Sequence, residues 1–227
     1  MSWIWILMVL PAVLAVLIAL IRPAQLRGTI VYAGAGSLMA LTLGYWMGRG
    51  METVLLYEET ELTDHLMLGG EIFLMGLIVY QSVRHRKYPI AVLSVVQTGM
   101  MVWMETQLSV AGGTHMMLDR LSMLMCIIIA FVGGLICIYA VGYMKAYHIH
   151  HKEYADRSSF FLSMLFLFLA AMFGLVLSSN LVWLYFFWEI TSVISFLLIG
   201  YTRTDEAVDN SFRALWMNLL GGLGFAA

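Results

Sequence analysis

The segment NLVWLYFFWEITSVISFLLIGY, residues 180–201, contains a single charged side chain, Glu189, in an otherwise uncharged and mostly apolar segment. Between Arg157 and Arg203 the sequence holds no other charged residue. A segment of this length and apolarity is long enough to cross the ~30 Å hydrocarbon core of a bilayer as a helix. The segment therefore predicts a membrane span with an acid near its middle.

This acid does not prevent the helix from inserting into a membrane. Residues 180–200 contain twelve Leu, Ile, Val or Phe. Each contributes about −0.3 to −0.6 kcal/mol on the insertion scale, whereas one central acid costs about 2.5–3.5 kcal/mol. The helical repeat places Tyr185 and Ser192 on the same face as Glu189, at i−4 and i+3. Their hydroxyls are therefore candidates to hydrogen-bond the acid or a chain of water molecules.

Two interpretations of Glu189 follow from the residues alone. In the first, a protonated and hydrogen-bonded glutamate holds helices together. In the second, Glu189 is a proton or cation site. Ionisable groups at bilayer depth are costly and usually mark an ion pathway with a partner nearby, which favours the second. No Lys, Arg or His of this chain is predicted at a matching depth to be that partner.

The composition of the whole chain agrees with a membrane protein. Apolar residues make up 62% and charged residues 11%, with a mean hydropathy of +0.88, against roughly 45–50% and 25% in soluble domains. We therefore expect an all-α, polytopic transmembrane bundle. The net charge of −2 predicts no nucleic-acid partner. We find no phosphate loop, CxxC pair or nucleophile–base spacing, so we predict no cofactor and no covalent chemistry in this chain.

The uncharged runs predict the positions of the helices. We expect seven full spans near residues 2–21, 29–48, 66–83, 88–104, 118–143, 160–178 and 180–200. An eighth helix is incomplete, because residues 214–227 reach only about 21 Å as a helix. We expect that the polypeptide continues beyond this sequence or that another chain completes the fold.

The basic residues predict the orientation. Ten of the twelve Lys and Arg residues fall on alternate loops, which we predict to be cytoplasmic, and this places the N-terminus outside. These residues are Arg22, Arg27, Arg84, Arg86, Lys87, Lys145, Lys152, Arg157, Arg203 and Arg213.

Several segments, taken in order, resemble one family of membrane proteins. They are LDRLSMLMCIIIAFVGGLICIYAVGYM (118–144), FLFLAAMFGLVLSSNLVWLYFFWE (166–189), FWEITSVISFLLIGY (187–201) and SFRALWMNLLGGLGF (211–225). Together they resemble the antiporter-like subunits of respiratory complex I, membrane-bound hydrogenases and Mrp-type sodium/proton antiporters. Within this family, the Gly221-Gly222 pair and the sequence ITSVISFLLIGY most resemble the large Mrp-type subunit and its hydrogenase relatives.

The resemblance implies a division of the chain and a role for Glu189. Residues 118–227 would be the N-terminal part of an ion-translocating domain. Residues 1–117 would hold four helices where the family has two, and these could form a docking surface. In the family, the glutamate that matches Glu189 works with a lysine on a later helix that this sequence does not reach. Another membrane subunit would then supply the Lys-bearing half-channel, and the ion would be H⁺ or Na⁺. The implied location is the inner membrane of a prokaryote.

Glu71 and the Asp119-Arg120 pair are further candidates. Glu71 lies near the outer end of the third span, where an acid more often reaches water; beside Gly69-Gly70, an ion-entry role is the minority interpretation. The preferred interpretation of Asp119 is that its side chain caps the N-terminus of a helix. The alternative, which follows from the resemblance, is that Asp119 and Arg120 form a structural ion pair with another helix.

Two polar loops complete the candidates. The outer loop METVLLYEETELTD (51–64) is expected to be solvated, with a cation-concentrating patch as the weaker alternative. His148, His150 and His151 lie in a predicted cytoplasmic loop. Without a cysteine nearby they favour a hydrated loop that touches a partner over a zinc site, so no metal is predicted.

The leading hypothesis is a membrane subunit that contributes the Glu-bearing half of a proton or sodium pathway. The alternative is a truncated, non-conducting subunit that scaffolds such a complex. An unrelated membrane receptor or enzyme is a third hypothesis, against which the ordered resemblance over 118–227 argues. Whether the whole assembly is an oxidoreductase stays open.

Overall fold

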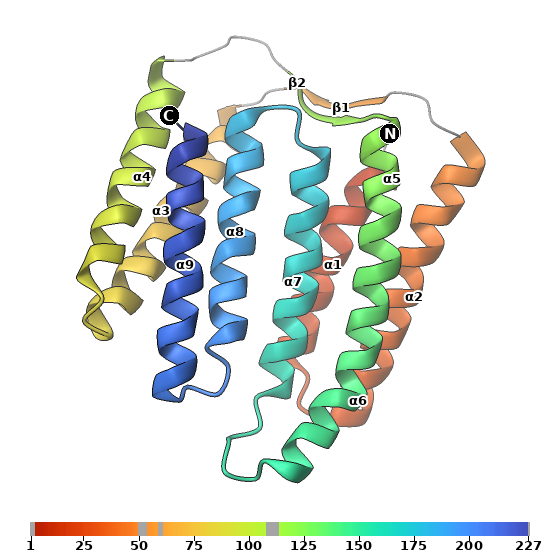
Figure 1. The fold of residues 1–227 in the computed structure, drawn as a ribbon. Coiled ribbons are helices and arrows are strands. Elements are labelled where there is room, and N and C mark those ends of the chain that lie inside the picture. Colours follow the sequence, from red (N-terminus) through yellow and green to blue (C-terminus); the bar gives the residue numbers. More distant parts are fainter. Residues whose placement is uncertain (1–2, 50–53, 59–60, 108–113, 227) are drawn as a thin grey trace. The chain divides into compact units, whose positions relative to one another are not determined.

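The computed structural model describes residues 3–49, 54–58, 61–107 and 114–226, and these residues are almost entirely helical (Figure 1). The helices are α1 (Trp3–Leu20), α2 (Ala24–Arg49), α3 (Glu61–Arg84), α4 (Tyr88–Gln107), α5 (Arg120–Ile128), α6 (Gly134–His150), α7 (Ser158–Leu177), α8 (Leu181–Ile199) and α9 (Asp205–Ala226). A π-helical turn, η1 (Ile129–Gly133), joins α5 to α6, so that these form one continuous rod.

The predicted all-α, polytopic fold class is confirmed. Among the described residues, five helical segments are long and apolar enough to cross a membrane: Ala24–Gly48, His65–Arg84, Arg120–His150, Ser158–Leu177 and Leu181–Ile199. Trp5–Leu20 and Tyr88–Trp103 are apolar but shorter. The chain is thus a multi-pass membrane protein. The number of seven full spans and the outside position of the N-terminus stay predictions.

Two short strands were not expected from the sequence. β1 (Val54–Glu58) pairs with β2 (Thr114–Leu118) in a two-stranded sheet. β1 lies inside the stretch that the sequence predicted as an acidic, solvated loop. The acids Glu52 and Glu59 of that stretch lie outside the described residues. The strand and the start of α3 at Glu61 therefore replace part of the predicted loop with regular structure.

The chain packs as two units that interleave along the sequence. Unit 1 comprises Met1–Leu56 and Met117–Leu177, and unit 2 comprises Tyr57–Met116 and Ser178–Ala227. Each unit therefore combines two helices from the first half of the chain with later helices. The division into residues 1–117 and 118–227 stays a prediction. Each packing unit contains residues from both sides of this boundary.

Unit 1 is held together by close packing and by one buried hydrogen bond. α1 lies along α7, and α2 lies along α6. The Ser163 hydroxyl of α7 donates to the Ala15 carbonyl of α1 at 2.6 Å. Gly34 brings α2 close to its neighbours, because a Cβ there would lie 2.6 Å from the Leu14 side chain and 3.3 Å from Phe166.

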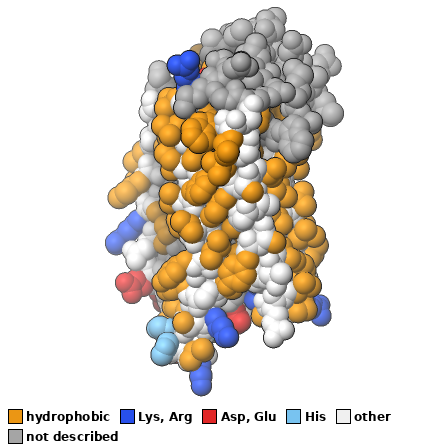
Figure 2. All heavy atoms as spheres, turned by 90° about the vertical axis from the view of Figure 1, so that its right-hand side faces the viewer, with side chains coloured by type: hydrophobic (Ala, Val, Ile, Leu, Met, Phe, Trp, Pro, Cys, Tyr) orange, Lys and Arg blue, Asp and Glu red, His pale blue; other side chains and the backbone are white. Residues whose placement is uncertain are grey.

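One face of unit 1 is strongly apolar. Figure 2 shows the side on which α2 and α6 lie in Figure 1, with hydrophobic side chains over most of its height and most of the charged and histidine side chains near its lower end. On α6 the exposed hydrophobic residues include Leu135, Ile136 and Tyr139. This distribution fits a helix surrounded by lipid or by other membrane helices.

Unit 2 contains α3, α4, α8 and α9. α3 packs against α4 and α8, and α9 packs against α8 and α4. Its apolar core includes Ile78, Val193, Phe212 and Leu215. Gly70 permits the close approach of α3 to α8, because a Cβ there would lie 2.8 Å from the Phe186 ring.

The hairpin of α3 and α4 is set by its short turn. Arg86 has a φ of 57°, the Lys87 amide donates to the Ser82 carbonyl at 2.7 Å, and the Arg86 amide donates to the Val83 carbonyl at 3.1 Å. This is the Schellman arrangement, which ends a helix and satisfies its last carbonyls. The next helix then begins at Tyr88, with Pro89 in its first turn, where a missing N–H is tolerated.

The π-helical turn generates a prediction about packing. Gly133 ends this turn, and a Cβ there would collide with the Leu169 side chain of α7. Gly133→Val should destabilise the protein by about 1–3 kcal/mol, as overpacking of a close-packed interior usually does. Gly142→Val is the matched control on the same rod, because a Cβ at Gly142 meets nothing within 4 Å. Equal thermal unfolding temperatures of the two variants in detergent would contradict this account of the packing.

Candidate functional site

Glu189 lies in the interior of unit 2. Its side chain is 5% exposed, on helix α8. The helix begins at an N-cap, Asn180, whose side chain accepts a hydrogen bond from the Val182 amide at 2.9 Å. Such a cap fixes the start of the helix and hence which residues face inward. Tyr185, Glu189 and Ser192 are all buried, so the face predicted from the helical repeat is the inward face.

Two side chains donate to the same oxygen of Glu189. The Tyr185 hydroxyl donates to Glu189 Oε1 at 3.0 Å, from one helical turn earlier. The Gln97 amide nitrogen, from α4, donates to Glu189 Oε1 at 3.3 Å and also contacts the Tyr185 hydroxyl oxygen. Gln97 and Tyr185 are each 1% exposed. We call Gln97, Tyr185 and Glu189 the polar triad.

A glycine of α9 makes room for the triad. A Cβ at Gly222 would lie 2.5 Å from Gln97 Nε2 and 3.3 Å from Tyr185 Cε2. At the neighbouring Gly221, a Cβ would meet nothing within 4 Å. Gly222 therefore lies directly against Gln97 and Tyr185, and the absence of a side chain there leaves room for both of them.

The arrangement suits a carboxyl group that changes its protonation state inside an apolar environment. Hydrocarbon offers no hydrogen bonds, so a carboxylate there depends on donors from the protein. Charge-assisted hydrogen bonds to an ionised acceptor are stronger than neutral ones. Two donors on one oxygen can stabilise an ionised carboxylate at this position.

Glu71 is a second buried acid of unit 2. Its side chain, on α3, is 1% exposed, so the interpretation as an acid that reaches water at a helix end is wrong. It lies within electrostatic range of the Tyr185 hydroxyl. Glu71 and Glu189 are thus both buried acids of unit 2, and the minority interpretation of Glu71 as part of an ion path stays a prediction.

The remaining predicted residues do not join the triad. The Ser192 hydroxyl donates to the Trp188 carbonyl at 3.0 Å, a common pattern of helical serines. Asp119 caps α5 by accepting from the Ser122 amide at 2.7 Å, and this hydrogen bond holds the pKa of Asp119 below its usual value. The capping interpretation is therefore confirmed, whereas an ion pair of Asp119 or Arg120 with another helix stays a prediction.

The histidines at the end of α6 have local contacts. His148 Nε2 lies 3.4 Å from Asp156 Oδ1. The His151 ring stacks on Tyr147 with ring centroids 4.5 Å apart. The sequence predicted these histidines in a hydrated loop that touches a partner, but His148 and His150 lie in the last turn of α6 and His151 is its C-cap. The contact with a partner stays a prediction.

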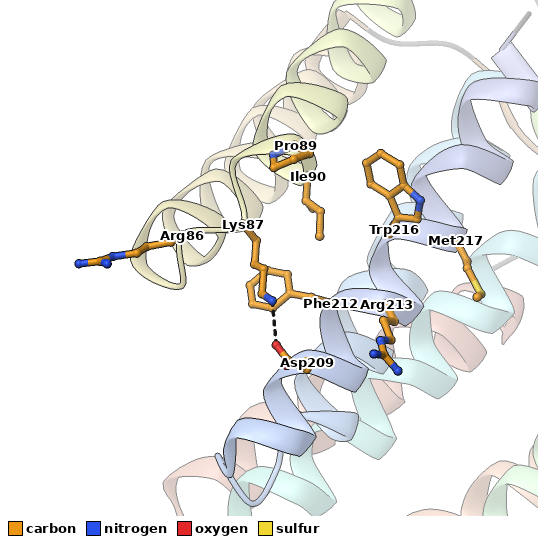
Figure 3. Close-up of a pocket in the computed structure, with 9 residues that line it drawn as sticks. All are labelled: Arg86, Lys87, Pro89, Ile90, Asp209, Phe212, Arg213, Trp216 and Met217. Carbon is orange, nitrogen blue, oxygen red and sulfur yellow. Dashed lines mark ion pairs between the residues drawn. The ribbon is translucent and has the colours of Figure 1, made fainter.

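A separate cavity of about 410 Å³ lies where α4 and α9 begin (Figure 3). Ile90, Trp216 and Met217 contribute to its apolar walls, and Arg86 points away from it. The Lys87 ammonium pairs with Asp209 Oδ1 at 2.8 Å beside the cavity. The triad residues do not line it, so the cavity and the triad are two distinct features of unit 2.

Gln97 is the residue of the triad that the sequence analysis missed. Gln97 lies outside the segment that contains Glu189, so the helical repeat does not relate the two residues, although a primary amide at the middle of an apolar helix is also costly to bury without a partner. The cost of burying the Gln97 amide is the sequence feature that could have indicated a polar partner. The identity of the partner was not readable, because the contact joins residues of two helices that are far apart in the sequence.

Comparison with known proteins identifies two matched segments. Residues 103–161 match the family described as NADH-ubiquinone oxidoreductase (complex I), chain 5 N-terminus, and residues 178–226 match NADH:quinone oxidoreductase/Mrp antiporter, TM. The predicted resemblance to the complex I/Mrp antiporter-like family is thereby confirmed. The second segment contains Glu189 and Tyr185, whereas Gln97 and Glu71 precede both segments.

Individual relatives agree with these family matches. The Na(+)/H(+) antiporter subunit A1 of Staphylococcus haemolyticus (strain JCSC1435) is 38% identical over 107 residues, which is 47% of this chain and 12% of that protein. The protein of the same description from Staphylococcus aureus (strain JH9) is 36% identical over 107 residues, with the same coverage. The matched region thus spans about an eighth of the length of these relatives.

The Lys87–Asp209 pair generates a prediction about pH. The pKa of Asp209 lies below its usual value, because Lys87 donates a hydrogen bond to it and adds a positive charge. A carboxylate with a lowered folded-state pKa stabilises the fold above its unfolded-state pKa, and this contribution is lost as the pH falls through the folded-state value. The unfolding temperature of the wild type relative to Asp209→Asn should therefore fall as the pH drops below about 4. A pH-independent difference between the two proteins would contradict this assignment.

Proposed function

Because residues 103–161 and 178–226 match models of the complex I/Mrp antiporter-like family, we propose that this chain is an ion-translocating membrane subunit in which Glu189 exchanges a proton or sodium ion. The observation that carries the proposal is the burial of Glu189 within a cluster of polar side chains in an apolar unit. A residue that served packing alone would be less costly as a hydrophobic side chain of similar size.

The proposed mechanism is electrostatic. When a cation approaches Glu189 from a neighbouring group, the ionised form of the carboxyl is favoured; when the cation withdraws, the protonated form is favoured. Glu189 would then release and take up its proton in step with that movement. The Tyr185 hydroxyl and the Gln97 amide keep the ionised carboxylate hydrogen-bonded during the charged phase.

We propose that other membrane subunits, or a further part of the polypeptide, supply the cationic partner, with a lysine as its functional group. The relatives named above are subunits of Na(+)/H(+) antiporters, which supports a multi-subunit complex in the cytoplasmic membrane of a bacterium. A carboxylate site is compatible with H⁺ and with Na⁺. Transport measurements with each ion would show which of the two is carried.

Glu71 extends the proposed path within unit 2. It is buried and lies within electrostatic range of Tyr185, so a proton or cation that leaves Glu189 can be received by a second carboxyl group on α3. In this proposal Tyr185 lies between the two acids. The path would then involve the α3–α4 hairpin, which precedes the second matched segment.

The central test is Glu189→Gln. Glutamine has the size of glutamate and still accepts hydrogen bonds through its carbonyl oxygen, so the complex should assemble, while ion transport should fall to the background of empty membranes. The measurement is ion-gradient dissipation in vesicles that contain the complete complex, with the amount of assembled complex quantified in parallel.

A matched control is Glu206→Gln. Glu206 lies in the first turn of α9, in the same unit, and is exposed. This variant should transport like the wild type. Wild-type transport by the Glu189 variant would overturn the proposal and favour the scaffold hypothesis, in which Glu189 only links α8 to α4.

A second variant tests the extension to Glu71. Glu71→Gln removes the second carboxyl group while keeping the shape of the side chain, so transport should be slowed with the complex intact. If Glu71→Gln transports normally and Glu189→Gln does not, the path through α3 is wrong and the role of Glu189 stands.

A further inference from the structure

The donor and the acceptor of the Gln97 amide differ in their contacts. Its nitrogen donates to Glu189 Oε1 and contacts the Tyr185 hydroxyl oxygen. Its oxygen, Oε1, is buried and has no hydrogen-bond partner among the described residues. A buried amide acceptor without a partner is costly, so the arrangement needs a reason.

The observed pattern suits an ionised Glu189. A carboxylate accepts hydrogen bonds and donates none, and here it receives one from Tyr185 and one from Gln97. After Glu189 takes up a proton, its carboxyl group carries an O–H that needs an acceptor. Rotation of the Gln97 amide by half a turn about its last side-chain bond exchanges NH₂ and oxygen, and brings that acceptor to the acid.

We propose that Gln97 is a positioning residue that pairs with Glu189 in both protonation states by rotating its amide. This proposal rests on the proposed function of Glu189. In the ionised state the amide nitrogen donates to the carboxylate; in the protonated state the amide oxygen accepts from the carboxyl O–H. The O–H bond that forms and breaks belongs to Glu189 alone, and Gln97 gains and loses no proton.

The surroundings of the amide support this role. The titratable groups that contact the amide nitrogen are Glu189 and Tyr185 of α8. Glu71 of α3 interacts electrostatically with Tyr185, while α9 places Gly222 against the amide nitrogen. The acid, the phenol and the backbone of α9 at Gly222 therefore surround the amide nitrogen. A methyl group at Gly222 would occupy part of the space around this nitrogen.

The position of Gln97 in the chain gives the α3–α4 hairpin a function. Gln97 precedes residue 103, where the first family match begins. The helices before the matched segments would therefore do more than form a docking surface, because one of them supplies a partner for the central acid of a later helix.

The test compares two adjacent glycines. Gly222→Ala places a Cβ 2.5 Å from Gln97 Nε2, whereas Gly221→Ala places one where nothing lies within 4 Å. In the complete complex, Gly222→Ala should slow transport by about tenfold, as expected for loss of a hydrogen bond to a charged group. Gly221→Ala should transport like the wild type.

A second variant and a spectroscopic measurement separate positioning from packing. Gln97→Met keeps the length of the side chain and removes both hydrogen-bonding groups, so it should slow transport to a similar extent. In both slow variants the infrared carbonyl band of protonated Glu189, assigned by its loss in Glu189→Gln, should shift toward the position of a carboxylic acid with fewer hydrogen bonds. Thr98→Val, at the adjacent buried position of α4, should leave this band unchanged.

The outcomes separate this inference from the proposed function. Wild-type transport and an unshifted band in Gly222→Ala and Gln97→Met, with transport still lost in Glu189→Gln, would overturn the role of Gln97 alone. Wild-type transport in Glu189→Gln would overturn the proposed function itself. Slow transport without a band shift in the Gln97 and Gly222 variants would mean that they act through packing, and would also overturn the inference.

Discussion

The hydrogen bonds received by Glu189 are the interaction on which the structure of unit 2 depends. A carboxyl group within an apolar bundle finds no donors in hydrocarbon, so the protein must supply them. Tyr185 supplies one from the same helix, and Gln97 supplies another from α4. Gly222 of α9 leaves room for the Gln97 side chain beside the acid. Residues of three helices thus meet around this polar cluster.

The interleaved packing follows the same logic. α3 and α4 precede the second matched segment by many residues, yet they pack in one unit with α8 and α9. They contribute apolar core residues such as Ile78, and also the buried polar residues Gln97 and Glu71. α1 and α2 pack in the same manner with α6 and α7 in unit 1. The first four helices are therefore integral parts of the two units rather than additions to their surface.

The sequence alone predicted the helices well because membrane insertion is governed by local apolarity. The uncharged run at 180–200 corresponds to α8, and the run at 160–178 corresponds to α7. It also predicted that Tyr185 faces the same way as Glu189, since the helical repeat relates residues of one helix. Contacts between helices carry no such local signal, which is why Gln97 was missed and why Glu71 was misjudged as an acid near water. The strand at 54–58 was missed for a similar reason, because its partner strand lies far away in the sequence.

The central claim is that Glu189 changes its protonation state as ions move. Infrared difference spectroscopy of the complete complex, recorded with and without an imposed ion gradient, tests this claim most directly. A carboxyl band that appears and disappears with transport, and that is absent in a complex with glutamine at position 189, is the predicted result. Transport without any change in that band would contradict the account.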